Sequence, residues 1–91
     1  MVVKEMKVEN KKGQKEVKIY STPTCVYCNA AKDFFRANGV VYSEFDVAAD
    51  FAKRKEMIEK SGQMGVPVIM IGEDLIVGFD EVRIADALGV V

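Results

Sequence analysis

The stretch Ser21-Thr22-Pro23-Thr24-Cys25-Val26-Tyr27-Cys28 decides the fold, because it joins a short apolar run to a helical pattern and contains both cysteines of the chain. A Cys-x-x-Cys pair at the start of a helix places its first sulfur beside backbone N–H groups that lack intrahelical partners, and their partial positive charge favours thiolate over thiol. Cys25 is therefore the expected nucleophile. Cys28 comes one helical turn later, within disulfide-forming distance, and we expect it to be more shielded and to act as the resolving thiol.

The residues on either side of this stretch predict a strand, a helix and a second strand. Residues 17–20 are β-branched or aromatic apart from Lys18, and they predict a short central strand. Residues 26–38 have apolar positions three and four apart, with Gly39 as the stop, and predict a helix whose inward face carries Cys28, Ala31 and Phe35. Residues 40–46 predict the second strand. A unit of this length is typical of a right-handed parallel crossover.

The second half of the chain predicts a helix, a hairpin and a last helix. Residues 50–60 predict a helix capped by Gly62, and residues 66–71 predict an apolar strand that begins at a proline. A turn at residues 72–74 and a strand at 75–77 make the second pair antiparallel. The last helix ends at Gly89. The expected fold class is α/β, a four-stranded mixed sheet with three helices in the order βαβαββα.

The inward faces of the last two helices can also be read from the spacing of their apolar residues. In the helix at 50–60 we expect Phe51, Met57 and Ile58 to face inward, and in the last helix Val82, Ala85 and Leu88.

Composition limits the protein to one small domain and narrows its partners. The chain has 91 residues with 13 basic and 14 acidic side chains, so its overall charge favours neither a nucleic acid nor an anionic membrane as partner. No apolar run approaches the roughly 18 residues of a membrane span. We expect a cytoplasmic protein, a compartment where paired cysteines are more often catalytic, redox-sensing or metal-binding than structural. Residues 17–91 form the expected domain, and residues 1–16 an N-terminal extension, either an added edge strand or a loose tail.

Three motifs together carry a family resemblance. With Cys-x-x-Cys after the first strand, Val66-Pro67 before the third and Gly78-Phe79-Asp80 before the last helix, residues 17–88 resemble a glutaredoxin of the thioredoxin superfamily. The run from Ile19 to Cys25 is most similar to the small glutaredoxin-like and NrdH-type redoxins. The resemblance implies a thioredoxin-like fold and a thiol–disulfide oxidoreductase that carries electrons to protein disulfides or mixed disulfides.

The resemblance also implies roles for particular residues. Cys25 and Cys28 would be the catalytic pair, Tyr27 the aromatic residue of the active-site tetrapeptide, and Pro67 a cis-proline that faces the cysteines. The backbone of Val66 would then pair with an extended substrate segment. From the residues alone, Phe79 fits packing as well as binding, and Pro67 also fits a plain strand start. The full set implied for substrate or glutathione binding is Thr24, Val26, Tyr27, Val66, Pro67, Gly78, Phe79 and Asp80.

Several positions depart from the family pattern and leave the electron donor open. Thr22 stands where glutathione-using members carry Lys or Arg, so one anchor for a glutathione carboxylate is missing. Val77 stands at the first position of the family's Gly-Gly pair, and Val26 replaces the tetrapeptide's usual proline. Asp80 and Glu81 occupy the places of the family's two acids, where they and a helix N-terminus would hold the γ-glutamyl end of glutathione. The expected donors are therefore glutathione or a thioredoxin-reductase-type enzyme.

A second class of function stays open at this point. Two chains, or one chain with glutathione, could complete the ligand set of an iron–sulfur cluster or another metal. One chain alone supplies two cysteines and no histidine, whereas a structural zinc site needs four ligands. The oxidoreductase hypothesis instead expects a monomer that needs neither a metal nor a tightly bound cofactor, with a disulfide-bearing protein as substrate.

Overall fold

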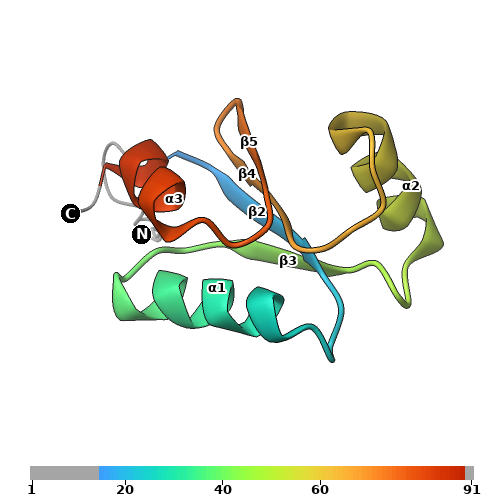
Figure 1. The fold of residues 1–91 in the computed structure, drawn as a ribbon, viewed down its shortest axis with the longest axis horizontal. Helices are drawn as coiled ribbons and strands as arrows, with labels where there is room; N and C mark the ends of the chain where they lie inside the picture. Colours follow the sequence, from blue (N-terminus) through green and yellow to red (C-terminus); the bar gives the residue numbers. More distant parts are fainter. Residues whose placement is uncertain (1–14, 90–91) are drawn as a thin grey trace, which may run out of the picture.

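A four-stranded mixed sheet forms the centre of the molecule (Figure 1). The computed structural model describes residues 15–89. Strand β2 (Val17–Ser21) lies parallel to β3 (Ser43–Asp46) and antiparallel to β4 (Val68–Ile71), which pairs antiparallel with β5 (Asp74–Val77). The sheet order is β3-β2-β4-β5, so β2 is central as expected. The sequence prediction of one parallel crossover followed by an antiparallel hairpin is confirmed.

Helices cover both faces of the sheet. Helices α1 (Val26–Ala37) and α3 (Glu81–Leu88) pack on one face around Ile19, Phe35 and Ile84, and helix α2 (Phe51–Ser61) packs on the other face near Tyr20 and Met57. The split follows from strand geometry, because successive side chains of β2 point to opposite faces. Figure 1 shows α1 and α3 approaching each other while α2 stands apart from them.

Short polar residues start the two later helices. The carboxylate of Asp50 accepts a hydrogen bond from the backbone N–H of Lys53 at 3.0 Å, and Asp80 does the same for Arg83 at 3.2 Å. Such N-caps satisfy donors that have no partner within the helix. Helix α2 ends at Gly62, whose φ of +73° lies in the left-handed region, as expected of a C-terminal glycine.

The second and third predicted strands begin later in the chain than the sequence predicts. The second strand begins at Ser43, not at residue 40, since the N–H of Val40 is still bonded to the carbonyl of Phe35 at the end of α1, at 2.8 Å. Pairing with β2 starts at Lys18 and Ser43. The third strand begins at Val68, two residues later than expected, after Pro67, which has no N–H to donate to a ladder.

The predicted inward faces of α2 and α3 were partly wrong. Phe51 is 77% exposed and Val82 is 78% exposed, whereas Met57 and Ile84 are fully buried. Each residue turns a helix by about 100°, so Phe51 lies about 120° around the axis from Met57, and Val82 about 160° from Ile84. Ile58 and Leu88 do pack against the core as expected, and Ala85 is half-buried.

The predicted N-terminal extension lies outside the described residues except for its last two. Those two contact the hairpin: the carbonyl of Glu16 accepts from the N–H of Gly72 at 2.8 Å, and Lys15 pairs with Asp74 at 3.7 Å. Within residues 15–89, no helix is both long and apolar enough to cross a membrane.

Candidate active site

Cys25 lies at the N-terminus of α1, where unpaired backbone N–H groups can stabilise negative charge on a side chain. It is the N-cap of α1, with extended backbone angles, and its sulfur accepts a hydrogen bond from the N–H of Cys28 at 3.1 Å. Its own N–H donates to the carbonyl of Thr22 at 3.3 Å and closes a turn at residues 22–25, just before the helix. The side chain is partly exposed and its thiol is free. A disulfide substrate can therefore reach a sulfur that already accepts a hydrogen bond from a backbone N–H of the first helical turn.

Cys28 lies in a different environment, although it is only one turn away. It is 0% exposed and belongs to the inward face of α1, with Ala31 and Phe35. Burial is the main reason that the pKa of the Cys28 thiol is raised to about 12, and its hydrogen bond and charge contact with Cys25 raise that pKa further. A backbone hydrogen bond from Thr22 and the charge of Lys32 act in the opposite direction. The two thiols thus differ as expected from the sequence, one accessible and the other held as the neutral thiol.

The loop before β4 lies against the first cysteine. The Val66–Pro67 peptide bond is cis, and the thiol of Cys25 lies 3.9 Å from the carbonyl oxygen of Val66. Pro67 is buried, and its carbonyl accepts from the N–H of Gly78 at 2.8 Å. These contacts place Cys25, Val66, Pro67 and Gly78 in one continuous group, although they are up to 53 positions apart in the chain.

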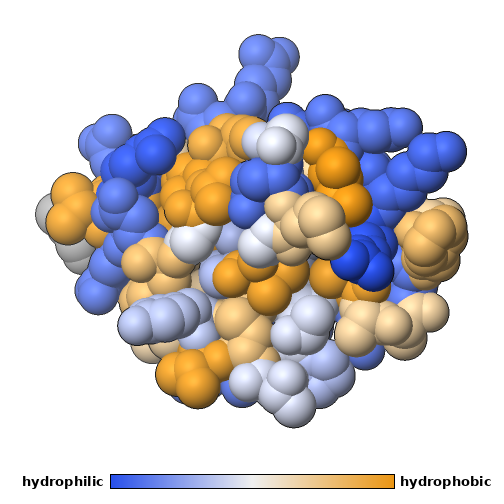
Figure 2. Space-filling view, turned by 45° about the vertical axis from the view of Figure 1, so that its right-hand side comes forward, coloured by the Kyte–Doolittle hydropathy of each residue, from blue (hydrophilic) through white to orange (hydrophobic). Residues whose placement is uncertain are grey.

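The side chains beside Cys25 are exposed and mostly apolar. Val26 is 74% exposed and Tyr27 is 65% exposed, and Thr24 is also exposed. Figure 2 shows that the lower part of one face is covered by apolar and weakly polar side chains, while strongly hydrophilic ones lie above and at the sides. The first turn of α1 contains no acidic residue. The immediate surroundings of the nucleophile therefore suit contact with an uncharged surface.

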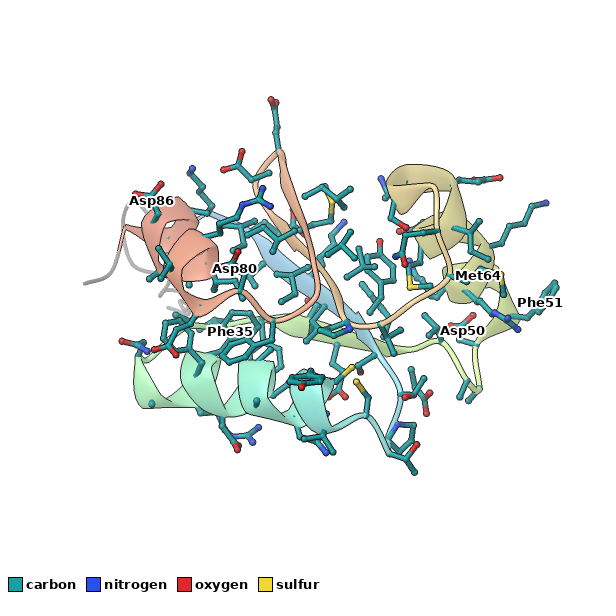
Figure 3. All side chains as sticks on the ribbon, in the orientation of Figure 1. Phe35, Asp50, Phe51, Met64, Asp80 and Asp86 are labelled. Carbon is teal, nitrogen blue, oxygen red and sulfur yellow. The ribbon has the colours of Figure 1, made fainter. Side chains whose placement is uncertain are left out.

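Phe79 and Asp80 already have partners within the chain. The ring of Phe79 packs edge-on against Phe34, with centroids 6.2 Å apart, and the side chain is half-buried. The carboxylate of Asp80 caps its own helix, at the start of α3 in Figure 3. Of the two interpretations of Phe79, the structure favours packing. A ligand at Asp80 would share the carboxylate with the backbone of Arg83.

A polar network beside Cys28 was not predicted from the sequence. Lys32 donates to the Glu44 carboxylate at 2.6 Å, and the hydroxyl of Ser21 donates to the same oxygen at 3.1 Å. Ser21 is completely buried, and the hydrogen bond from Lys32 is the main reason that the pKa of Glu44 is lowered. The signal in the sequence was the spacing of Cys28 and Lys32, since residues four apart share a helix face.

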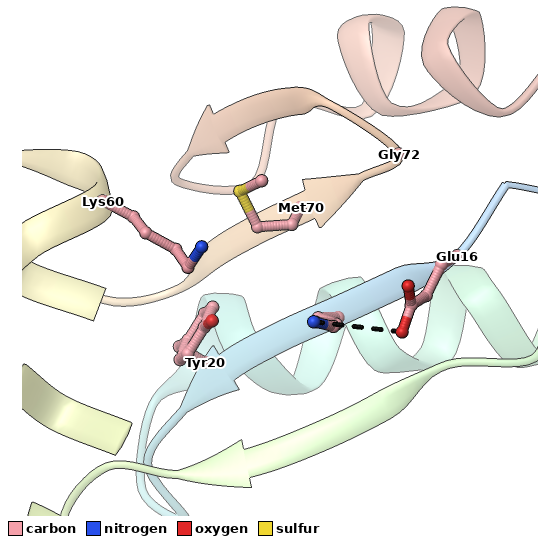
Figure 4. A pocket seen from close by; sticks show the side chains of 6 residues that line it. Glu16, Tyr20, Lys60, Met70 and Gly72 are labelled. Atoms are coloured by element: carbon pink, nitrogen blue, oxygen red, sulfur yellow. Dashed lines mark ion pairs between the residues drawn. The ribbon is translucent and has the colours of Figure 1, made fainter. Parts of the chain in front are cut away.

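Other polar groups lie away from the cysteines. A small hollow near α2, shown in Figure 4, is lined by Glu16, Lys18, Tyr20, Lys60, Met70 and Gly72. The residues from 15 to 89 contain no group of three or more histidine, cysteine, aspartate or glutamate side chains that could hold a metal ion.

Comparison with known proteins gives a consistent result. Residues 17–76 match the glutaredoxin family model. The chain is 43% identical over 68 residues to an uncharacterized glutaredoxin-like 8.6 kDa protein of the rubredoxin operon in Clostridium pasteurianum, covering 75% of this chain and 91% of that protein. It is 41% identical over 73 residues to glutaredoxin 3 of Escherichia coli K12, covering 80% and 88%.

The solved structures agree with these relatives. The crystal structure of a point mutant of a thioredoxin-like protein superposes with a TM-score of 0.80 at 28% identity, covering 85% of this chain and 99% of that one. The molecule therefore has the thioredoxin fold, with Cys25 and Cys28 close together at the start of α1. By its sequence and its structure, the chain belongs to the glutaredoxin family, with a thiol–disulfide redox function.

Proposed function

We propose that this chain is a dithiol oxidoreductase that reduces protein disulfides or mixed disulfides, with Cys25 as nucleophile and Cys28 as resolving thiol. The observation that carries the proposal is the contrast between the two sulfurs. Cys25 is partly exposed and accepts the Cys28 N–H, whereas Cys28 is fully buried with a pKa raised to about 12. Only one of the pair is available to begin an exchange.

The reaction has two steps. The Cys25 thiolate attacks one sulfur of the substrate disulfide, a mixed disulfide forms, and the other substrate sulfur leaves as a thiolate with the electron pair of the broken bond. Cys28 then loses its proton and attacks Cys25, which releases the second substrate thiolate and leaves a Cys25–Cys28 disulfide. The substrate gains two electrons and the protein loses two.

The backbone at Val66 supports the positioning of a peptide substrate. Its carbonyl lies 3.9 Å from the Cys25 sulfur, in a loop held by the bond between Gly78 and Pro67. An extended segment laid beside this loop could pair with the main chain and bring its sulfur to Cys25. The exposed side chains of Val26 and Tyr27 would then contact the substrate.

The proposed donor is either glutathione or a thioredoxin-reductase-type enzyme, and no metal or tightly bound cofactor takes part. Thr22 provides no cation for a glutathione carboxylate, and Asp80 already caps α3. Both features favour a reductase protein as donor. We propose that the protein works as a monomer in the reducing cytoplasm, where its dithiol would be regenerated.

Two variants test the dithiol route. Cys28→Ser should still form a mixed disulfide through Cys25 but lose turnover of a disulfide-bearing protein, and Cys25→Ser should lose both. The measurements are mass spectrometry of the trapped adduct and the rate at which the pre-reduced protein, with no other thiol present, reduces an equimolar substrate disulfide. Full turnover by Cys28→Ser with a protein substrate would overturn the dithiol route. Comparing reduction of the oxidised protein by glutathione and by NADPH with thioredoxin reductase identifies the donor.

A further inference from the structure

The polar network of Ser21, Glu44 and Lys32 joins the edge strand β3 to α1 and runs from a buried hydroxyl to a Glu44 side chain that is 40% exposed. Ser21 is fully buried at the end of β2, and the Lys32 side chain is 13% exposed on α1. Phe45 packs with the cluster on the α2 face, so strand alternation points the neighbouring Glu44 to the α1 face, the face on which Cys28 lies. Buried polar groups need hydrogen bonds and are costly to leave unpaired, so a network here calls for an explanation.

The second step of the proposed dithiol function offers an explanation for this network, and this explanation therefore rests on that function. When the mixed disulfide resolves, the Cys28 S–H bond breaks and its proton passes to solvent. The sulfur forms a bond to Cys25, and the substrate sulfur leaves with the electron pair of its old bond and takes up a proton from water. Negative charge therefore has to develop on a sulfur that has no contact with solvent.

The charged and titratable groups around Cys28 are few. Among the described residues, Cys25 and Lys32 of helix α1 are the titratable groups that act on Cys28. Glu44 of β3 accepts from Lys32, and the charge of Arg36, one turn further along α1, also acts on Glu44. Of these two cations, Lys32 is the one that acts on Cys28, and it lies one helical turn from it.

We infer that Lys32 is a positioning residue for the resolving step, and that its ammonium, held by Glu44 and Ser21, favours the Cys28 sulfur as that sulfur loses its proton. Glu44 fixes the ammonium through the 2.6 Å hydrogen bond, and Ser21 fixes the carboxylate. The carboxylate also opposes the ammonium, so its own charge acts against thiolate formation. The two members of the pair should therefore have opposite electrostatic effects on one step.

A two-phase reaction with dithiobis(nitrobenzoate) separates the steps. Attack by Cys25 releases one thionitrobenzoate, and attack by Cys28 on the mixed disulfide releases a second, so one stopped-flow trace reports both. We expect Lys32→Met, which keeps the length of the side chain and removes its charge, to slow the second phase roughly three- to tenfold at neutral pH. The plot of log rate against pH for the second phase should shift to higher pH by roughly 0.5–1 pH unit. The first phase should be unchanged.

Matched variants distinguish charge from packing. Lys32→Arg keeps the charge and should leave the rate of the second phase near that of the wild-type protein. Glu44→Gln, whose amide oxygen still accepts from Lys32, should shift the pH profile of the second phase to lower pH. A shift in the same direction for Lys32→Met and Glu44→Gln would show a merely structural role and overturn the inference, as would an unchanged profile in Lys32→Met. If Lys32→Met does not fold, the direction of the Glu44→Gln shift decides alone. Absence of a second phase in the wild-type protein would instead refute the proposed dithiol function.

Discussion

The raised pKa of Cys28 predicts a specific loss of stability in alkaline solution. Burial moves this pKa from an ordinary value of 9.0 to about 12 in the folded, reduced protein. Between these two values the unfolded chain has released the proton while the folded chain still binds it. Stability rises with pH only where the unfolded state binds more protons, so here it must fall. The contribution is fully present below the ordinary pKa and is lost as the pH rises toward 12.

The size of the effect follows from linkage. Raising the pH from about 8 to about 10 should lower the free energy of unfolding by about 1.4 kcal/mol through Cys28 alone, about three quarters of it above pH 9. Tyr20, whose pKa is also raised by burial and by Glu56, contributes to the same trend in every variant. Cys28→Ala should therefore lose about 1.4 kcal/mol less than the wild-type protein over this range.

Urea denaturation of the reduced proteins at the two pH values measures this difference. Cys25→Ser is the matched control: it keeps Cys28 buried and should show the wild-type fall, because burial is the largest cause of the shift. Denaturant slopes must agree between variants for the comparison to hold. Equal losses in the wild-type protein and in Cys28→Ala would refute the reasoning, since they would mean that folding does not hold the proton on this sulfur.

Two further predictions concern the fold and the electron donor. Ile84→Ala should cost about 2–5 kcal/mol in urea denaturation because Ile84 is fully buried, while Val82→Ala, at a position 78% exposed, should stay within about 0.5 kcal/mol; equal effects would contradict the assigned face of α3. Thr22→Lys should raise the catalytic efficiency with a glutathionylated substrate by about one to two decades, since a charged hydrogen bond contributes about 1.5–3 kcal/mol. An unchanged efficiency would show that a cation at this position does not assist glutathione.

Much of the fold could be predicted from the sequence because its signals are local. Gly62 and Gly89 end helices since their left-handed conformation favours glycine, and the parallel and antiparallel directions of the two strand pairs followed from the lengths of their connections. The division of roles between Cys25 and Cys28 was also local, because an N-cap and a position one turn inside a helix differ in any protein. The cis form of Pro67 came from the family resemblance and not from spacing.

What the tertiary structure decided is which groups meet between elements. The apolar pattern of α2 and α3 left more than one side available, and contact with the sheet selected Met57 and Ile84 over Phe51 and Val82. The approach of β3 to α1 brought Glu44 to Lys32, a pairing across 12 positions that no period in the sequence encodes. Periodicity determines how side chains are arranged around one element, but burial and charge environment depend on distances between elements, and those exist only once the chain has packed.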